Sequence, residues 1–280
     1  MASSTLAFGE KVAMAPLKLL WLNPVNTPDY DQVFANMIAR VKLPNAEVHV
    51  MSLKLSPPIM LDNLEWRIFE SFIWQSVAHM AHFAAINAFD GFAIGCFYDT
   101  AFEEAREVSG EAIVAAPCDA SLKVISTVCN RFSVIIGVEK WKVQMEDRIR
   151  HYGYHEKLAS FRTIRMHVDE LQVDTKKTEE AIRNAVRRAK DEDSAEGVIL
   201  GCTMEFGFYA VLQNEFNIPV IDAALACYKE MEHAATNKVQ FGWKPSRLYS
   251  MEPPSKERLN KSGIFAGSAP IGNHIVLPKT

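Results

Sequence analysis

Short apolar runs alternate with longer segments of helical periodicity along most of this chain, and this alternation is the feature that most constrains its fold. The runs have the length and composition of buried strands, and the intervening segments carry apolar residues at helical spacing. Strands joined by helical crossovers form parallel sheets with helices on both faces. The sequence therefore predicts an α/β protein. Strands are expected within residues 18–22, 46–53, 90–97, 111–117, 131–138, 161–168, 195–202 and 218–223.

The order of strands and helices is similar in the two halves of the chain, which predicts two pseudo-symmetric lobes with the active site in the cleft between them. Lobe 1 is expected to comprise residues 17–115 plus 223–236, and lobe 2 residues 116–222. From residue 237 to 280 the sequence is rich in Pro, Ser and Lys, with isolated aromatic residues and no sustained period. This tail is predicted to be a docked arm or partly disordered.

Composition excludes several classes of function. A formal net charge of −4, with both signs spread along the chain, leaves no basic field for nucleic acid or an anionic membrane. No apolar stretch approaches the roughly 18 residues of a membrane span, and residues 1–20 lack the regions of a signal peptide. Five widely spaced cysteines fit neither a disulfide framework nor a CxxC metal site, so reduced thiols and a cytoplasmic location are expected.

Two stretches repeat one construction: "AIGCFYDT" at residues 93–100 and "VILGCTME" at residues 198–205. In each, an apolar strand ends in Gly-Cys, so Cys96 and Cys202 are placed at the carboxyl ends of strands, where ligands bind in such sheets. Two thiols that face each other across a cleft can remove a proton from one side of a carbon and return it from the other. This is the chemistry of a racemase or epimerase without a cofactor. The other three cysteines are interpreted as structural residues.

The residues around both cysteines resemble a known family. Residues 195–223, "AEGVILGCTMEFGFYAVLQNEFNIPVIDA", are similar to the C-terminal signature of the aspartate/glutamate/hydantoin racemase superfamily. "DGFAIGCFYDTAFEEAREV" at 90–108 and "LNPVNT" at 22–27 resemble the hydantoin and allantoin racemase branch. The resemblance covers residues 17–235 and implies a two-lobed fold, no cofactor, no metal and a homo-oligomer. It also implies that Cys96 and Cys202 are the two acid/base residues.

The same resemblance implies the groups that hold the substrate. Asn23 and Thr27, with the loop that follows each cysteine, would bind a carboxylate or ring carbonyls. The loop at 22–27 is one residue longer than usual, so Asn26 could replace Asn23. Ile136 and Gly137 stand where hydantoin racemases tend to place a hydroxyl pair, so one substrate contact is expected to be supplied differently. The predicted substrate-binding residues are Asn23, Asn26, Thr27, Phe97, Tyr98, Thr203 and Met204; Phe206 and Tyr209 could line the pocket or belong to the core.

The first functional hypothesis is racemisation of 5-substituted hydantoins or of allantoin, so the expected partner is a small molecule, a cyclic ureide or a small carboxylate. A second hypothesis is another reaction in the same cleft, such as maleate-type cis-trans isomerisation, decarboxylation, or racemisation of aspartate or glutamate. A third is a non-catalytic small-molecule binder or a thiol redox sensor. Loss of turnover on replacing either cysteine would separate the enzymes from the binder.

Overall fold

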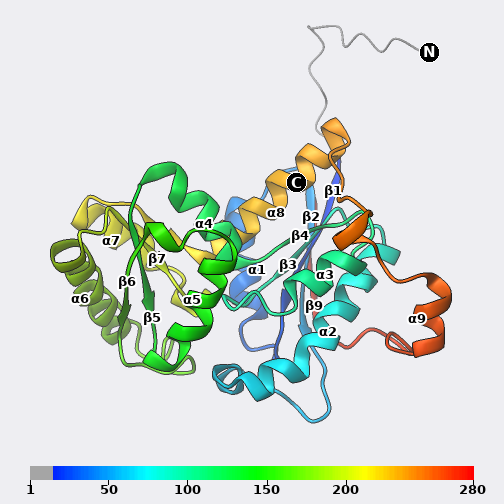
Figure 1. Cartoon of the computed structure of the whole chain (residues 1–280), viewed down its shortest axis with the longest axis horizontal. Helices are drawn as coiled ribbons and strands as arrows, with labels where there is room; N and C mark the ends of the chain where they lie inside the picture. The colour runs from blue at the N-terminus through cyan, green and yellow to red at the C-terminus, as the bar shows by residue number, and fades with distance from the viewer. Residues whose placement is uncertain (1–14) are drawn as a thin grey trace, which may run out of the picture.

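The computed structural model describes residues 15–280, which form two parallel-stranded sheets flanked by helices. Figure 1 shows the two sheets side by side along the long axis of the molecule. The α/β class and the two-lobed arrangement predicted from the sequence are thereby confirmed. The prediction that the N-terminus lacks a signal peptide rests mainly on residues 1–14, which lie outside the described residues.

Lobe 1 contains a five-stranded sheet in the order β4-β3-β1-β2-β9. Four strands are parallel, and β9 runs antiparallel to β2, with Val48 opposite Leu277. The central strand β1 is an almost continuous apolar run because helices cover both faces of the sheet. The elements of this lobe are β1 Leu17–Asn23, α1 Asp31–Val41, β2 Ala46–Leu53, α2 Arg67–Ile86, β3 Gly91–Ile94, α3 Phe102–Val108, β4 Ile113–Ala115 and β9 Ile271–Leu277.

Lobe 2 contains a four-stranded parallel sheet in the order β6-β5-β7-β8. The charged helix α6 buries Ile182, Val186 and Ala189, spaced three or four residues apart, and leaves its other face to solvent. The edge strand β6 ends at Thr163, whereas the sequence predicted a strand over 161–168. Ile164 and Met166 still donate hydrogen bonds to the carbonyls of Ile136 and Gly137, but the extended backbone is broken at Arg165, whose φ is 59°. The elements are β5 Phe132–Ile136, α5 Lys142–His151, β6 Leu158–Thr163, α6 Thr175–Asp193, β7 Gly197–Leu200, α7 Tyr209–Phe216 and β8 Val220–Asp222.

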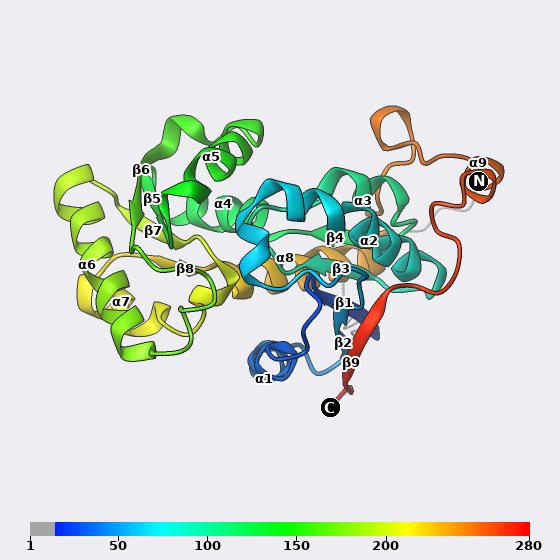
Figure 2. The ribbon, with the colours of Figure 1, turned by 90° about the horizontal axis from the view of Figure 1, so that it is seen from below.

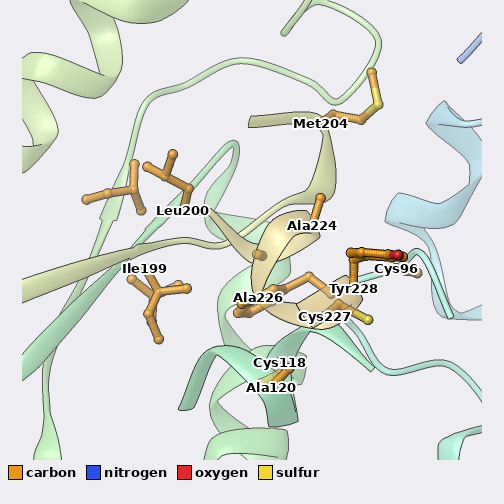
Figure 3. Close-up of a cluster of buried hydrophobic side chains, with 14 of the residues drawn as sticks. Cys96, Cys118, Ala120, Ile199, Leu200, Met204, Ala224, Ala226, Cys227 and Tyr228 are labelled. Carbon is orange, nitrogen blue, oxygen red and sulfur yellow. The ribbon is translucent and has the colours of Figure 1, made fainter. Parts of the chain in front are cut away.

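Two helices connect the lobes and pack against each other. The helix α4 (Pro117–Val128) follows β4 of lobe 1 and leads into lobe 2, whereas α8 (Ala223–Phe241) follows β8 of lobe 2 and covers β1, β3 and β4 of lobe 1. Figure 3 shows Cys118 and Ala120 of α4 beside Ala226 and Cys227 of α8. These four small side chains are buried, so the two helices can approach closely. Cys118 and Cys227 are therefore packing residues between the lobes.

The segment after α8 lies along lobe 1 (Figures 1 and 2). Arg247 donates hydrogen bonds to the carbonyls of Arg106 (2.7 Å) and Glu107 (3.2 Å), and the ring of Phe265 stacks on His82 with 4.8 Å between centroids. The helix α9 (Lys256–Ser262) and the strand β9 follow. The segment thus wraps around α2 and α3 and ends as an edge strand.

Candidate active site

Cys96 and Cys202 line one cavity between the lobes, with a volume of about 50 Å³. Each follows a glycine directly after a strand, β3 in lobe 1 and β7 in lobe 2. A Cβ on Gly95 would lie 2.8 Å from the carbonyl oxygen of Leu22, and one on Gly201 would lie 2.7 Å from that of Ile135. The neighbouring strand leaves no room for a side chain at either position. In both lobes the glycine therefore allows close packing against the neighbouring strand, and the cysteine that follows it lines the cavity.

Burial controls the state of the Cys96 thiol. It raises the pKa of Cys96 to about 12, and the nearby carboxylate of Glu70 acts in the same direction. Hydrogen bonds from the Tyr98 amide and the Thr100 hydroxyl favour the thiolate and lower the pKa, but they do not outweigh burial. At this buried position the thiol form therefore prevails over the thiolate.

Cys202 has a similar environment. Burial, and then the charge of Glu205, raise the pKa of this thiol well above its ordinary value. The Met204 amide donates to Sγ at 3.4 Å and opposes this shift. The charge of Cys96 adds a smaller contribution that raises the pKa of Cys202. Burial raises the pKa of Tyr98, and the charges of Cys96 and Cys202 act in the same direction. Both sulfurs therefore lie close enough to Tyr98, in the wall of the same cavity, to influence its pKa.

Most of the predicted substrate-binding residues surround this space. Phe97, Tyr98, Thr203 and Met204 line the cavity. An adjoining cavity of about 20 Å³ shares Gly95, Thr203 and Met204 with the first, and its wall includes Asn23 and Thr27. The Thr203 hydroxyl donates to the Gly95 carbonyl at 3.1 Å and so joins the exits of β3 and β7.

The two asparagines of the 22–27 loop differ. Asn23 lies at the cavity wall, and its amide is held by Trp21, whose Nε1 donates to Oδ1 at 2.8 Å, and by the carboxylate of Asp31. Asn26 lines neither cavity; its Oδ1 accepts from the Leu55 amide, which fixes the following loop. Phe206 packs on Phe34, with 5.6 Å between ring centroids, and lines neither cavity. Tyr209 likewise lies outside both walls.

Several wall residues were missed by sequence reasoning: Leu61, Leu64, Glu65, Trp141, Met145 and Val168. Most lie on connections that have no periodicity. Met145 lies on the helix α5, and Trp141 comes shortly after the exit of β5, the strand next to β7. Its Nε1 is buried and has no hydrogen-bond partner. Since Ile136 and Gly137 offer no side-chain donor at this strand exit, the indole N–H is a donor that sequence reasoning could have sought there.

Glu65 closes one side of the cavity. Its carboxylate accepts hydrogen bonds from the Val168 amide (2.9 Å) and pairs with Nδ1 of His167 (2.7 Å), so a lobe 1 side chain is tied to lobe 2. The hydrogen bond to Glu65 raises the pKa of His167. Because both Glu65 and Val168 line the cavity, this contact holds the lobes closed around the thiols.

Two aspartates fix the loops that carry the cysteines. Asp99 accepts from the amides of Cys118 (2.8 Å) and Asp119 (2.9 Å) at the start of α4 and from the Tyr152 hydroxyl (2.9 Å). Asp222 caps α8 by accepting from the Ala224 and Leu225 amides, and it also accepts from Gly207 in the loop after Cys202. Each cysteine loop is thus bound to the first turn of a helix that connects the lobes.

Within residues 15–280, no helix combines the length and apolarity needed to cross a bilayer. The same residues contain no group of three His, Cys, Asp or Glu side chains arranged to hold a metal ion. The wall of the cavity carries two thiols and aromatic rings, and the Met204 main-chain amide donates to one of the sulfurs.

The fold and the site define a class: a two-lobed α/β protein in which each lobe contributes one cysteine to a shared cavity. Within this class the chain belongs to the Asp/Glu/hydantoin racemase family, whose sequence model matches residues 19–231. This confirms the family predicted from the motifs.

Relatives and solved structures agree with this assignment. The chain is 32% identical to a hydantoin racemase of Pseudomonas sp. (strain NS671) over 168 residues, 60% of this chain and 66% of that protein. It is 32% identical to a hydantoin racemase of Rhizobium meliloti over 143 residues, 51% and 59% of the two chains. Both alignments span slightly less than two thirds of the relative. The fold is similar to that of an allantoin racemase from Klebsiella pneumoniae, with a TM-score of 0.76, 22% identity and coverage of 86% of this chain and 94% of that one.

Proposed function

We propose that this protein is a cofactor-independent racemase of 5-substituted hydantoins or of allantoin, acting through Cys96 and Cys202. The observation that carries the proposal is the pair of cysteines, one from each lobe, in the wall of a single cavity. The hydantoin racemases among its relatives support a cyclic ureide as the substrate.

In the proposed reaction, one cysteine acts as a thiolate and removes the proton from C5 of the ring. The electron pair of the C–H bond delocalises into the neighbouring carbonyl to form an enolate. The thiol of the other cysteine then protonates C5 from the opposite face, which inverts the centre and leaves the two sulfurs with exchanged protonation states. The reverse reaction uses the same groups in the opposite order.

Donors around the cavity stabilise the enolate. The phenol of Tyr98 keeps its proton, because burial and the two thiols raise its pKa, and it can donate to a ring oxygen. The buried indole N–H of Trp141 has no partner and can do the same. Fixed donors in a site that excludes water are the main means by which enzymes stabilise developing oxyanions. The cavity has a volume of about 50 Å³ and is open to the surface, and a wider opening for substrate would separate the contacts of Glu65 with His167 and Val168.

The proposal is tested by proton NMR in deuterium oxide with single enantiomers of 5-substituted hydantoins and of allantoin, alongside optical rotation. We expect the C5–H signal and the rotation to disappear together in the wild type. Cys96→Ser and Cys202→Ser should each lower the rate at least about 100-fold, since each removes one of the two acid/base groups. Cys129→Ser is the matched control, because Cys129 lies outside the cavity.

Other results would assign another function. New vinyl signals from maleate-type substrates, or release of carbon dioxide, would mean that the thiols serve a different reaction. Full activity of either cavity variant would refute the two-thiol mechanism. A reversible Cys96–Cys202 disulfide without turnover would indicate a redox sensor.

We further propose a homo-oligomer in the cytoplasm. The first turns of α2 and the segment before it expose six large apolar side chains on lobe 1, more than a monomer commonly leaves together. A second copy of this chain is the proposed occupant of this apolar patch, which consists of Met60, Trp66, Ile68, Phe69, Phe72 and Trp74. The five free thiols fit a reducing compartment.

A further inference from the structure

The last strand of the chain is connected to the wall of the candidate active site. This strand, β9 (Ile271–Leu277), pairs with β2 at the edge of the lobe 1 sheet and contacts α1. Figure 2 shows β9 beside β2. The strand lies beyond residues 19–231, which match the family model. Membership of the family therefore does not explain what β9 contributes to the site.

A β-bulge in the β9–β2 pairing determines which way Asn273 points. Opposite the interval from Met51 to Leu53 of β2, the strand β9 holds one residue more than regular pairing allows. A bulge of this kind moves the side chains beyond it to the other face of the sheet. Accordingly, Ile271 packs on the core cluster that contains α2, whereas Ile275 packs on the cluster that contains α1. Asn273 is on the same side of the bulge as Ile275, and its side chain reaches α1.

On α1, Asn273 contacts a buried carboxylate. Nδ2 of Asn273 donates to Oδ2 of Asp31 at 2.9 Å. Asp31 is the first residue of α1 and is completely buried. Its other oxygen, Oδ1, accepts a hydrogen bond from Nδ2 of Asn23. The two asparagine amides thus share one carboxylate, with one amide on each oxygen, and loss of either would leave a buried oxygen without a partner.

Asn23 is at the other end of these contacts, in the wall of the cavity that adjoins the two thiols. Its Oδ1 accepts from Nε1 of Trp21 at 2.8 Å, and its Nδ2 donates to Asp31. A side-chain amide has two N–H groups, and among residues 15–280 only Asp31 accepts from this one. The second N–H is therefore available to a ligand in the cavity. A continuous chain of hydrogen bonds runs from this wall residue through Asp31 to Asn273.

We propose that Asn273 is a positioning residue for racemisation, which acts through Asp31 to fix the side-chain amide of Asn23. The inference rests on the proposed racemase function, in which the second N–H of Asn23 donates to the ring oxygen that becomes the enolate oxygen. A donor that is held in place stabilises a developing oxyanion without having to reorganise during the reaction. Asn273 itself lines neither cavity. Its contribution is to keep Asp31, and hence Asn23, in one orientation.

The first test is Asn273→Leu, which removes the donor to Asp31 and keeps a side chain of similar size. The measurement is racemisation of one enantiomer of a 5-substituted hydantoin or of allantoin by polarimetry, over a range of substrate concentrations. We expect kcat to fall at least about fivefold and KM to change less than about twofold, because the donor acts mainly on the enolate. The matched control is Ile275→Ala, which weakens the packing of the same strand but leaves the hydrogen bond of Asn273 intact. It should lower the melting temperature and leave kcat within about twofold of the wild type.

Two further comparisons test whether the effect passes through the proposed chain. Asn273→Asp places a second carboxylate against Asp31 and should lower kcat at least as much as Asn273→Leu. Adding Asp31→Asn exchanges donor and acceptor and should restore kcat to within about threefold of the wild type. Asn23→Ala should itself lower kcat, and Asn273→Leu in that background should lower it less than about twofold further, because the two residues act through one group.

Three results would overturn the positioning role and leave the two-thiol reaction intact: an unchanged kcat in Asn273→Leu, an equal loss in Ile275→Ala, or effects of Asn23→Ala and Asn273→Leu that simply multiply. Failure of the exchanged pair to recover activity would also count against it. A wild-type protein that racemises neither 5-substituted hydantoins nor allantoin would instead overturn the proposed function, and the role of Asn273 with it.

Discussion

At the scale of single residues, the protonation state of the two cavity thiols sets the conditions for activity. Burial dominates over the hydrogen bonds from Tyr98 and Met204, and the carboxyl groups of Glu70 and Glu205 add to its effect. Both thiols are therefore protonated near neutral pH in the free enzyme. The proposed reaction starts from a form with one thiolate, which is the minor form at pH 7.

This predicts an alkaline dependence of kcat/KM. A thiol with a raised pKa gains thiolate character as the pH increases, so kcat/KM should rise by up to about tenfold per pH unit above pH 7. The measurement is the initial rate of racemisation from pH 6 to 10, after subtraction of the uncatalysed rate at each pH. If kcat/KM were already independent of pH at pH 6, the pKa of the reacting thiol in the enzyme during turnover would have to be lower than its raised pKa in the free protein.

Trp141 gives a second prediction at this scale. Trp141→Phe keeps an aromatic ring in the wall but removes the N–H that would bind a ring oxygen. One lost hydrogen bond of about 1–1.5 kcal/mol corresponds to a decrease in kcat/KM of about tenfold. The melting temperature should fall only through the smaller volume of the buried ring, because the N–H itself has no partner in the free protein. Trp66→Phe, at an exposed position, is the control; an unchanged kcat/KM in Trp141→Phe would exclude the indole as a substrate donor.

At the scale of secondary-structure elements, strand exits and helix starts position the site together. The loop after β3 is bound to the first turn of α4 through Asp99, and the loop after β7 to the start of α8 through Asp222. A carboxylate at a helix N-terminus is favoured by the free amides and the helix dipole. The geometry of each thiol thus depends on a helix that belongs to the connection between the lobes.

Asp99→Asn tests this coupling. The amide has one acceptor oxygen where the carboxylate has two, and its NH₂ group faces a donor. We expect a loss of about 2–3 kcal/mol in the free energy of unfolding, measured by urea denaturation, together with a lower kcat. The positive φ of 53° at this position is not the reason, because asparagine also adopts it readily. In the control Asp119→Asn, which changes a partly buried carboxylate that pairs with the half-exposed Lys123, the loss should be below about 1 kcal/mol; equal losses would argue against a special role for Asp99.

The strands were the part of the structure that the sequence predicted best. Fully buried parallel strands are continuous apolar runs, so β1, β3 and β7 and the cysteines after them could be located. Leu61 and Glu65 could not, because their positions in the wall depend on how irregular connections fold over the cleft. Similarly, Asn26 has the same local pattern as Asn23, and only the fold shows that its side chain binds the Leu55 amide. The raised pKa values of the two thiols could not be predicted either, because they result from burial, which depends on how the two lobes assemble.

At the scale of the whole molecule, the lobes are connected twice, by α4 and α8, and tied across the cavity by Glu65 and by Thr203. A wider opening of the lobes for substrate would separate these contacts, and the packing of α4 on α8 would remain as the connection between the lobes. Association of two copies through the apolar patch would also restrict the movement of the segment that carries Leu61, Leu64 and Glu65, because this segment lies next to the patch and lines the cavity.

The oligomer is tested by changing the centre of that patch. Phe72→Glu places a charge on an exposed part of α2, where it cannot be buried against a second copy, and should convert the oligomer into monomers without loss of secondary structure. The measurement is molar mass by size-exclusion chromatography with light scattering. Val173→Glu, on an exposed position of lobe 2, should leave the mass unchanged. A wild-type protein that is monomeric at micromolar concentration would contradict the proposal.

The pairing of β9 with β2 also has a consequence for how the protein is made. His49 and His274, whose side chains meet across this pair, are 225 residues apart in the chain. At the usual rate of translation, roughly 10–45 seconds pass between synthesis of the two strands, and all of lobe 2 emerges in that interval. Throughout it, the nascent lobe 1 exposes the unpaired edge of β2, the kind of edge through which partly made chains on one messenger RNA can associate. Chaperone protection of the ribosome-bound chain should therefore matter most in the interval before the last strand is released.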